Sequence, residues 1–182
     1  YMATHGELVA VGHQAGMNNS SGGGNTYVGY QSGKSTTTSG NNTFVGHEAG
    51  MSNTSSQNTF VGYRAGYTSN ASDVTYIGYD SGLHATGNSN TCVGHRTLDA
   101  SSCTGSANTA IGREGLSGLT TGADNVALGY FAGHDLTTGQ QNVFVGIDAG
   151  DAVTTGLRNI CVGCNANPGA STELSIVIGH DI

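Results

Sequence analysis

The chain has 182 residues, of which 31 are glycine, one is proline and none is tryptophan, and only 9% are charged. Glycine without a three-residue period excludes collagen, and the low content of charged residues disfavours intrinsic disorder. The net charge is −7, and no cluster of basic residues is present to bind nucleic-acid phosphates. No apolar run approaches the roughly 18 residues that a membrane helix needs. We therefore expect neither nucleic-acid binding nor membrane insertion.

A glycine preceded by an aliphatic residue recurs every 16 to 18 residues along the whole chain. A period of this length is typical of repeat proteins, in which each unit stacks on its neighbours. The spacing predicts a single repeat domain over residues 1–182, without a linker or a second domain. Its eleven coils are centred on Gly12, Gly29, Gly46, Gly62, Gly78, Gly94, Gly112, Gly129, Gly146, Gly163 and Gly179.

Each repeat glycine follows a short segment of β-branched and aromatic residues, which predicts a strand. The segments between them are rich in Asn, Ser, Thr and Gly, and no helical periodicity persists. We expect each coil to contain two short strands and two turns. The fold class is therefore all-β: a parallel β-solenoid, or β-roll, of about eleven coils of 16–18 residues, assembled as a homotrimer. The strands end, in chain order, at Val11, Val28, Val45, Val61, Ile77, Val93, Ile111, Leu128, Val145, Val162 and Ile178.

Successive residues of a strand point to opposite faces of its sheet. The residues one and three positions before the repeat glycine are aliphatic or threonine, and we expect them to face the interior of the coil. The residue two positions before it is often aromatic and would form an apolar stripe outside, which marks an interface with other copies of the chain. The predicted trimer interface consists of Tyr27, Phe44, Phe60, Tyr76, Cys92, Ala110, Ala127, Phe144 and Cys161.

The repeats NTFVGHEAG, NTFVGYRAG, NVALGYFAG and NVFVGIDAG resemble those of two related groups of proteins. One group is the head of trimeric autotransporter adhesins, whose similar N-S-V-A-I-G units build a left-handed parallel β-roll trimer. The other is the repeat-containing phage tail fibres, which are also trimeric. The coil is longer here than in adhesin heads, and the middle position is aromatic where adhesin heads favour alanine. These departures favour the phage fibre.

The resemblance implies a non-enzymatic structural and adhesive protein: a trimeric shaft or head of a phage tail fibre, located in the virion. Its partners would be two further copies of itself and a glycan or protein receptor on the host surface. The head of a bacterial trimeric adhesin, located at the cell surface, is the alternative. A monomeric ice-binding or ligand-binding β-solenoid is a hypothesis of another class.

Four histidines occupy the position after the repeat glycine, a position that otherwise holds mainly tyrosine. In a trimer this position places three imidazoles around one axis, where they would suit a metal ion. The same position also accepts Arg113, Ile147 and Cys164, which favours a surface or packing ladder, and we predict no metal site. The histidines are His13, His47, His95 and His180.

Catalysis has little support in the sequence. Carboxylates recur at Glu48, Asp80, Glu114 and Asp148, two positions after the repeat glycine, without a paired base or nucleophile, so we expect solvated turn residues. Cys161 and Cys164 form a C-x-x-C motif but have no second motif and no helix N-terminus beside them, which favours repeat positions over a zinc or redox site. We predict neither an enzyme nor a cofactor.

Two further features are ambiguous. Threonines from Thr26 to Thr109, three positions before the repeat glycine, match the ladders of ice-binding solenoids, but Val126 and Val143 replace them later, which favours an inward-facing position. Glycosylation sequons, which the abundance of Asn, Ser and Thr alone accounts for, occur at Asn18, Asn19, Asn41, Asn53 and Asn70.

Overall fold

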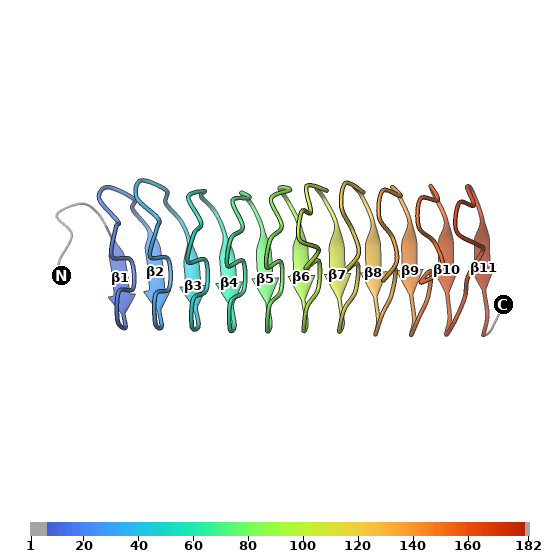
Figure 1. Cartoon of the computed structure of the whole chain (residues 1–182), viewed down its shortest axis with the longest axis horizontal. Helices are drawn as coiled ribbons and strands as arrows, with labels where there is room; N and C mark the ends of the chain where they lie inside the picture. Colours follow the sequence, from blue (N-terminus) through green and yellow to red (C-terminus); the bar gives the residue numbers. More distant parts are fainter. Residues whose placement is uncertain (1–6, 181–182) are drawn as a thin grey trace.

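The computed structural model describes residues 7–180 and shows a rod of stacked coils (Figure 1). Eleven strands form one parallel sheet in which each strand pairs with the strands before and after it in the chain. The all-β solenoid is therefore confirmed, and the predicted domain of residues 1–182 extends beyond the described residues at both ends. The strands are β1 (Leu8–Val11), β2 (Asn25–Val28), β3 (Thr43–Val45), β4 (Thr59–Val61), β5 (Thr75–Ile77), β6 (Thr91–Val93), β7 (Thr109–Ile111), β8 (Val126–Leu128), β9 (Val143–Val145), β10 (Ile160–Val162) and β11 (Ile176–Ile178).

Each coil contains one strand, and the second strand that we expected in each coil does not form within the described residues. Outside the named strands, the structure contains one isolated bridge, between Leu157 and Glu173. The remainder of each coil turns too often to stay extended, because several of its residues have a positive φ. In the coil after β3, φ is 56° at Glu48, 57° at Gly50 and 65° at Gln57.

The position two residues before each repeat glycine, which we call the core column, points into the coil. All nine residues predicted at the trimer interface lie in this column and are fully buried within a single chain: Tyr27, Phe44, Phe60, Tyr76, Cys92, Ala110, Ala127, Phe144 and Cys161. The expected placement of this column on the outer surface is therefore wrong. These nine residues form the interior of the solenoid and are not available for contact with another chain. Turns of the same chain enclose the aromatic rings, which stack on one another: the centroids of Phe44 and Phe60 are 4.6 Å apart.

The interior of each coil has room for few large side chains, and the sequence divides that room between two positions. Where the core column holds an aromatic ring, a glycine stands four residues after the repeat glycine, as in the pair Phe60 and Gly66. A Cβ at Gly66 would lie 2.7 Å from the Phe60 ring. In two coils the later position instead holds a buried leucine beside a small core-column residue, in the pairs Ala110 with Leu116 and Cys92 with Leu98. Ala127 keeps a glycine, Gly133, because side chains of the neighbouring coils fill that space: a Cβ at Gly133 would lie 2.6 Å from the Phe144 ring and 2.8 Å from the Leu116 side chain.

Buried asparagines connect the coils at the entrance to each strand. The side-chain oxygen of Asn108 accepts a hydrogen bond from the backbone nitrogen of Asn125, at 3.0 Å, and its nitrogen donates to the carbonyl of Gly122, at 3.1 Å. Each asparagine thus satisfies backbone groups of the next coil that would otherwise be buried without partners. The column consists of Asn25, Asn42, Asn58, Asn90, Asn108, Asn125, Asn142 and Asn159, with Val74 as its one interruption in this range.

The repeat glycine itself allows the coils to stack at the corner that follows each strand. At Gly46 φ is 143°, a conformation that side-chain-bearing residues rarely adopt, and a Cβ there would collide with the backbone carbonyl of Gly62 in the next coil. The regular recurrence of this glycine along the chain therefore has a steric cause.

Candidate functional site

Since the core column is inside, the residues one and three positions before each repeat glycine form the outer surface of the sheet, which we call the outer face. The prediction that these residues point inward is wrong. The exposed fractions of Ile77, Ile111 and Ile160 are 36%, 43% and 38%. The outer face has no charged residue and runs along all eleven strands of the rod (Figure 1). An apolar surface of this length is typical of an interface.

The outer face is not uniform along the rod. Three positions before the glycine, the first strands after β1 present threonine, and Thr109 pairs in register with Val126, where the column becomes aliphatic. Because this column points outward, its later replacement by Val126 and Val143 no longer disfavours ice binding. The threonines of the outer face are Thr26, Thr43, Thr59, Thr75, Thr91 and Thr109.

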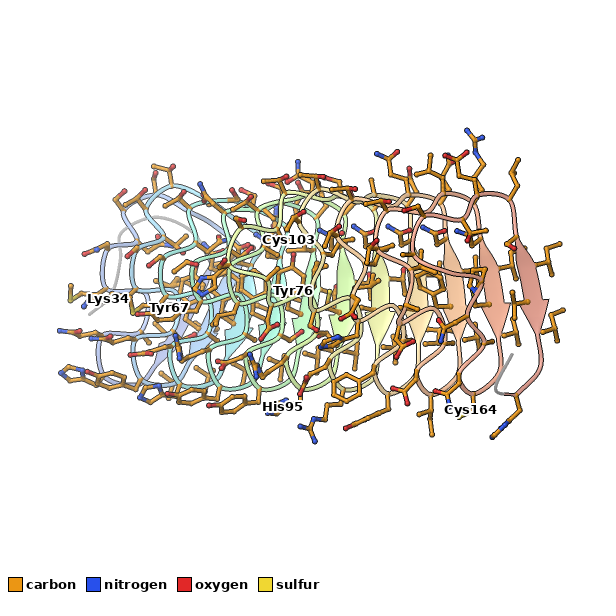
Figure 2. All side chains as sticks on the ribbon, turned by 45° about the vertical axis from the view of Figure 1, so that its right-hand side comes forward. Lys34, Tyr67, Tyr76, His95, Cys103 and Cys164 are labelled. Atoms are coloured by element: carbon orange, nitrogen blue, oxygen red, sulfur yellow. The ribbon has the colours of Figure 1, made fainter. Side chains whose placement is uncertain are left out.

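Aromatic rings stack along the corner that immediately follows the sheet, and we call this row the corner ridge. Its successive ring centroids are 5.3, 4.9, 5.2, 5.0 and 5.1 Å apart. Its three tyrosines are between 41% and 48% exposed. Figure 2 shows His95 at the same edge of the rod as Cys164, which occupies the equivalent position in a later coil. The corner ridge consists of His13, Tyr30, His47, Tyr63, Tyr79 and His95.

The corner ridge agrees with the expected surface ladder and separates the histidines. Tyrosine stands between His13 and His47, and Tyr63 and Tyr79 stand between His47 and His95. In the part of the chain that the structure describes, no three His, Cys, Asp or Glu side chains come together as a metal site would require.

Charged side chains of alternating sign lie one residue after the corner ridge position in the five coils from Glu48 to Glu114. Arg64 lies 4.0 Å from the carboxylate of Glu48 and 4.0 Å from that of Asp80, which belong to the coils on either side. Burial raises the pKa of Asp80, and Arg64 opposes this shift. The carboxylates Glu48 and Asp80 thus face the same cation, Arg64, from the two neighbouring coils.

The cysteines of the C-x-x-C motif lie on opposite sides of the corner. Cys161 is buried in the core column, whereas Cys164 is partly exposed at the position of the corner ridge, and both are free thiols. Burial raises the pKa of Cys103 and of Cys161 to about 11, so these thiols stay protonated at neutral pH. Thiolate chemistry of a redox motif is not supported at this pair.

Among the glycosylation sequons, Asn53 is buried and donates its side-chain nitrogen to the carbonyl of Ser69, and Asn19 is 8% exposed. Asn18, Asn41 and Asn70 are exposed.

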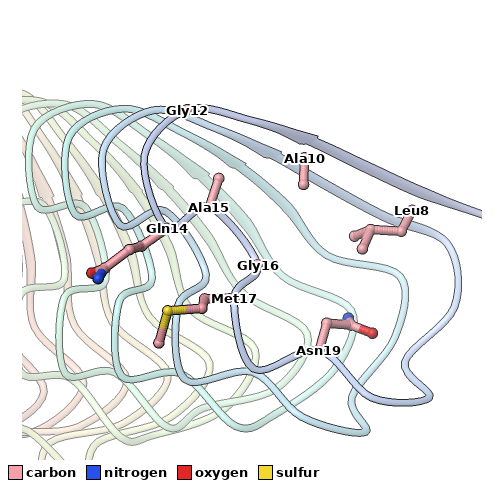
Figure 3. A pocket seen from close by; sticks show the side chains of 8 residues that line it. All are labelled: Leu8, Ala10, Gly12, Gln14, Ala15, Gly16, Met17 and Asn19. Carbon is pink, nitrogen blue, oxygen red and sulfur yellow. The ribbon is translucent and has the colours of Figure 1, made fainter. Parts of the chain in front are cut away.

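A cavity of about 460 Å³ opens at the N-terminal end of the described rod (Figure 3). It is the interior of the first coil seen end-on, and Leu8, Ala10, Ala15 and Met17 contribute to its lining. Its shape therefore belongs to the repeat, and it is not a cleft between separate elements.

No family model, curated protein or solved structure matches the chain. In the described residues, no helix is present that is long and apolar enough to span a membrane. Two features escaped the sequence analysis: the buried asparagine column and the true outer face. The exchange of an aromatic residue and glycine for alanine and leucine, visible in the sequence, was the signal that identifies the core column.

Proposed function

We propose that the protein is a non-enzymatic structural and adhesive segment of a fibre, a homotrimer that serves as shaft or head of a phage tail fibre and attaches to a host surface. The observation that supports this proposal is the outer face, an uncharged surface of aliphatic and threonine side chains that continues over eleven strands. A rod with one such face is most simply completed by copies of itself around a rotation axis. The repeat motifs, which resemble those of tail fibres, support the same architecture.

In this trimer the outer faces of three rods meet along the common axis, and the corners and loops remain accessible. Every coil then presents the same kinds of side chain at regular intervals, three times around the axis. Weak contacts with a surface receptor add through avidity when many are made together. The adhesive function requires this repetition and no catalytic group.

Native mass spectrometry and sedimentation of the purified chain test the assembly. We expect a particle of three chains, and a double variant with charges on the outer face, Ile77→Lys/Ile111→Lys, should be monomeric with an unchanged circular dichroism spectrum. A matched variant with two lysines on exposed loop positions, Thr121→Lys/Thr138→Lys, should remain trimeric. A wild-type chain that stays monomeric at all concentrations would refute the homotrimer.

A second function, ice binding by a monomeric solenoid, is favoured by one observation. Six threonines follow one another across neighbouring strands of the outer face, where they are available to order water. Thermal hysteresis of the monomer, lost in a Thr59→Lys/Thr75→Lys variant, would establish this function. A trimer without thermal hysteresis excludes it.

A further inference from the structure

The corner ridge is an exposed surface of the single chain, separate from the outer face that we assign to the proposed trimer interface. Its six rings lie with successive interplanar angles of 9°, 22°, 17°, 11° and 8°, so they present their edges to solvent in one row. The edges carry tyrosine hydroxyls and imidazole nitrogens, which donate and accept hydrogen bonds, beside apolar ring carbons. The row thus repeats one amphipathic group per coil.

The charges beside the ridge indicate an uncharged ligand. Arg64 contacts Glu48 and Asp80 and also lies over the ring of Tyr67, with 4.6 Å between the guanidinium carbon and the ring centroid. The side-chain nitrogen of Gln31 donates a hydrogen bond to the side-chain oxygen of Gln14 in the preceding coil, at 2.7 Å. The charged row from Glu48 to Glu114 contains three carboxylates and two arginines, so it carries no excess of positive charge that would attract an anionic ligand.

The spacing of the ridge indicates a ligand that is itself extended and periodic. Its rings repeat every 4.9 to 5.3 Å, close to the distance between neighbouring strands. One pyranose unit of an extended β-1,4-linked polysaccharide has this same length. Such a chain can place one sugar beside each coil, with successive sugars turned over and equivalent positions at every second coil, whereas an α-1,4-linked chain curves away after a few units.

We propose that the corner ridge binds a neutral, extended β-linked polysaccharide, with one sugar unit per coil over the six coils from His13 to His95. The ridge residues donate hydrogen bonds to and accept them from the sugar hydroxyls, and the ring carbons contact the apolar faces of the sugars. This inference names a receptor class for the adhesive function proposed above, but it concerns a surface within each chain and is independent of the homotrimer.

Isothermal titration calorimetry with defined oligosaccharides tests the proposal. The probes are β-1,4-linked hexamers of glucose, mannose and N-acetylglucosamine, the corresponding dimers, and the α-1,4-linked glucose hexamer. At least one β-linked hexamer should bind, its dimer should bind at least about tenfold more weakly because fewer coils are engaged, and the α-linked hexamer should not bind. Absence of binding by all β-linked hexamers, or equal binding of the α-linked hexamer, overturns the proposal.

Variants at one position of the repeat locate the site. Tyr63→Ala/Tyr79→Ala should weaken binding about tenfold or more, a loss that corresponds to about 1.4 kcal/mol. Ile147→Ala is the matched control, because Ile147 occupies the same position in a later coil, is 52% exposed and lies outside the ridge; its affinity should equal that of the wild type. Equal losses in both variants, or none in the tyrosine variant at unchanged thermal stability, overturn the assignment.

The two proposals fail separately. A monomeric chain that binds the β-linked hexamer at the ridge contradicts the trimeric fibre and leaves the ridge assignment intact. A trimer that binds no oligosaccharide contradicts the ridge assignment and leaves the trimeric fibre intact.

Discussion

The exchange of volume between the core column and the position four residues after the repeat glycine predicts how the interior of the rod responds to mutation. Coil 4 uses Phe60 with Gly66, and coil 7 uses Ala110 with Leu116. Transplanting the second pair into coil 4, as Phe60→Ala/Gly66→Leu, should preserve most of the stability that each single substitution loses. The conformation permits leucine there, because φ is 58° at Gly66 and 50° at Leu116.

The magnitudes follow from the geometry. Phe60→Ala leaves a cavity and costs about 3–5 kcal/mol. Gly66→Leu forces a side chain against the Phe60 ring, where a Cβ alone would lie 2.7 Å away, and costs about 1–3 kcal/mol for overpacking and about 1–2 kcal/mol for the left-handed conformation. In the double variant the leucine fills the cavity, so its loss should fall below the sum of the two by about 2–3 kcal/mol.

Chemical denaturation followed by circular dichroism measures this coupling, with each variant compared over the same transition because long repeat arrays can unfold in parts. Gly115→Ala is the control for replacing a glycine: its φ is not positive, and the nearest atom to its Cβ would be 3.7 Å away. It should be neutral or stabilising by up to about 1 kcal/mol. Additive losses in the double variant would show that the two side chains do not share one space, and would refute the reasoning.

Three further outcomes are expected. Asn108→Ala should cost about 1–3 kcal/mol in denaturation experiments, because the buried backbone nitrogen of Asn125 loses its acceptor; a cost near zero would contradict the role of the asparagine column. A thiol-reactive dye should modify Cys164 rapidly and the three buried cysteines slowly in the native protein; more than one fast thiol would contradict the burial. Stability should fall as pH rises above about 9, because the unfolded chain releases its thiol protons near pH 9 while burial raises the pKa of Cys103 and Cys161 to about 11 and that of Cys92 well above its ordinary value in the folded chain. A Cys92→Ala/Cys103→Ala/Cys161→Ala variant that shows the same decline would contradict this cause.

The positions of the strands were predictable from the sequence, and the faces of the strands were not. An aliphatic residue before each repeat glycine marks a strand whichever way its side chain points, so Val45 and Val61 identified β3 and β4 without identifying the interior. Both faces of each strand lack charge, and period-two alternation therefore gives no direction. The direction comes from the pairs Ala110 with Leu116 and Cys92 with Leu98, in which a leucine replaces the volume of the aromatic ring, so that both positions must lie inside the coil.

The candidate surfaces were predictable only in part. The position of His47 and Tyr63 was expected to form a ladder, and the structure stacks their rings at 5.2 Å. The role of Asn42 in the NTF motif depends on the coil that stacks on it, since its oxygen accepts from the backbone of Asn58. A contact of this kind is set by the register between coils, which the sequence of a single repeat does not contain.

The outer face leads to a last prediction, because its change from threonine to aliphatic residues separates the two proposed functions. Ile160 is 38% exposed, so covering it by a partner contributes about 0.5–1 kcal/mol per chain, while the exposed Thr43 contributes less apolar area at the equivalent position. Ile160→Lys should therefore raise the dissociation constant of the trimer more than Thr43→Lys, by about tenfold or more over three chains, as measured by sedimentation equilibrium. If the chain instead binds ice as a monomer, Thr43→Lys should reduce thermal hysteresis more than Ile160→Lys, because the threonines of the N-terminal strands would then carry the activity. A trimer weakened more by Thr43→Lys than by Ile160→Lys would contradict an axis formed by the whole outer face.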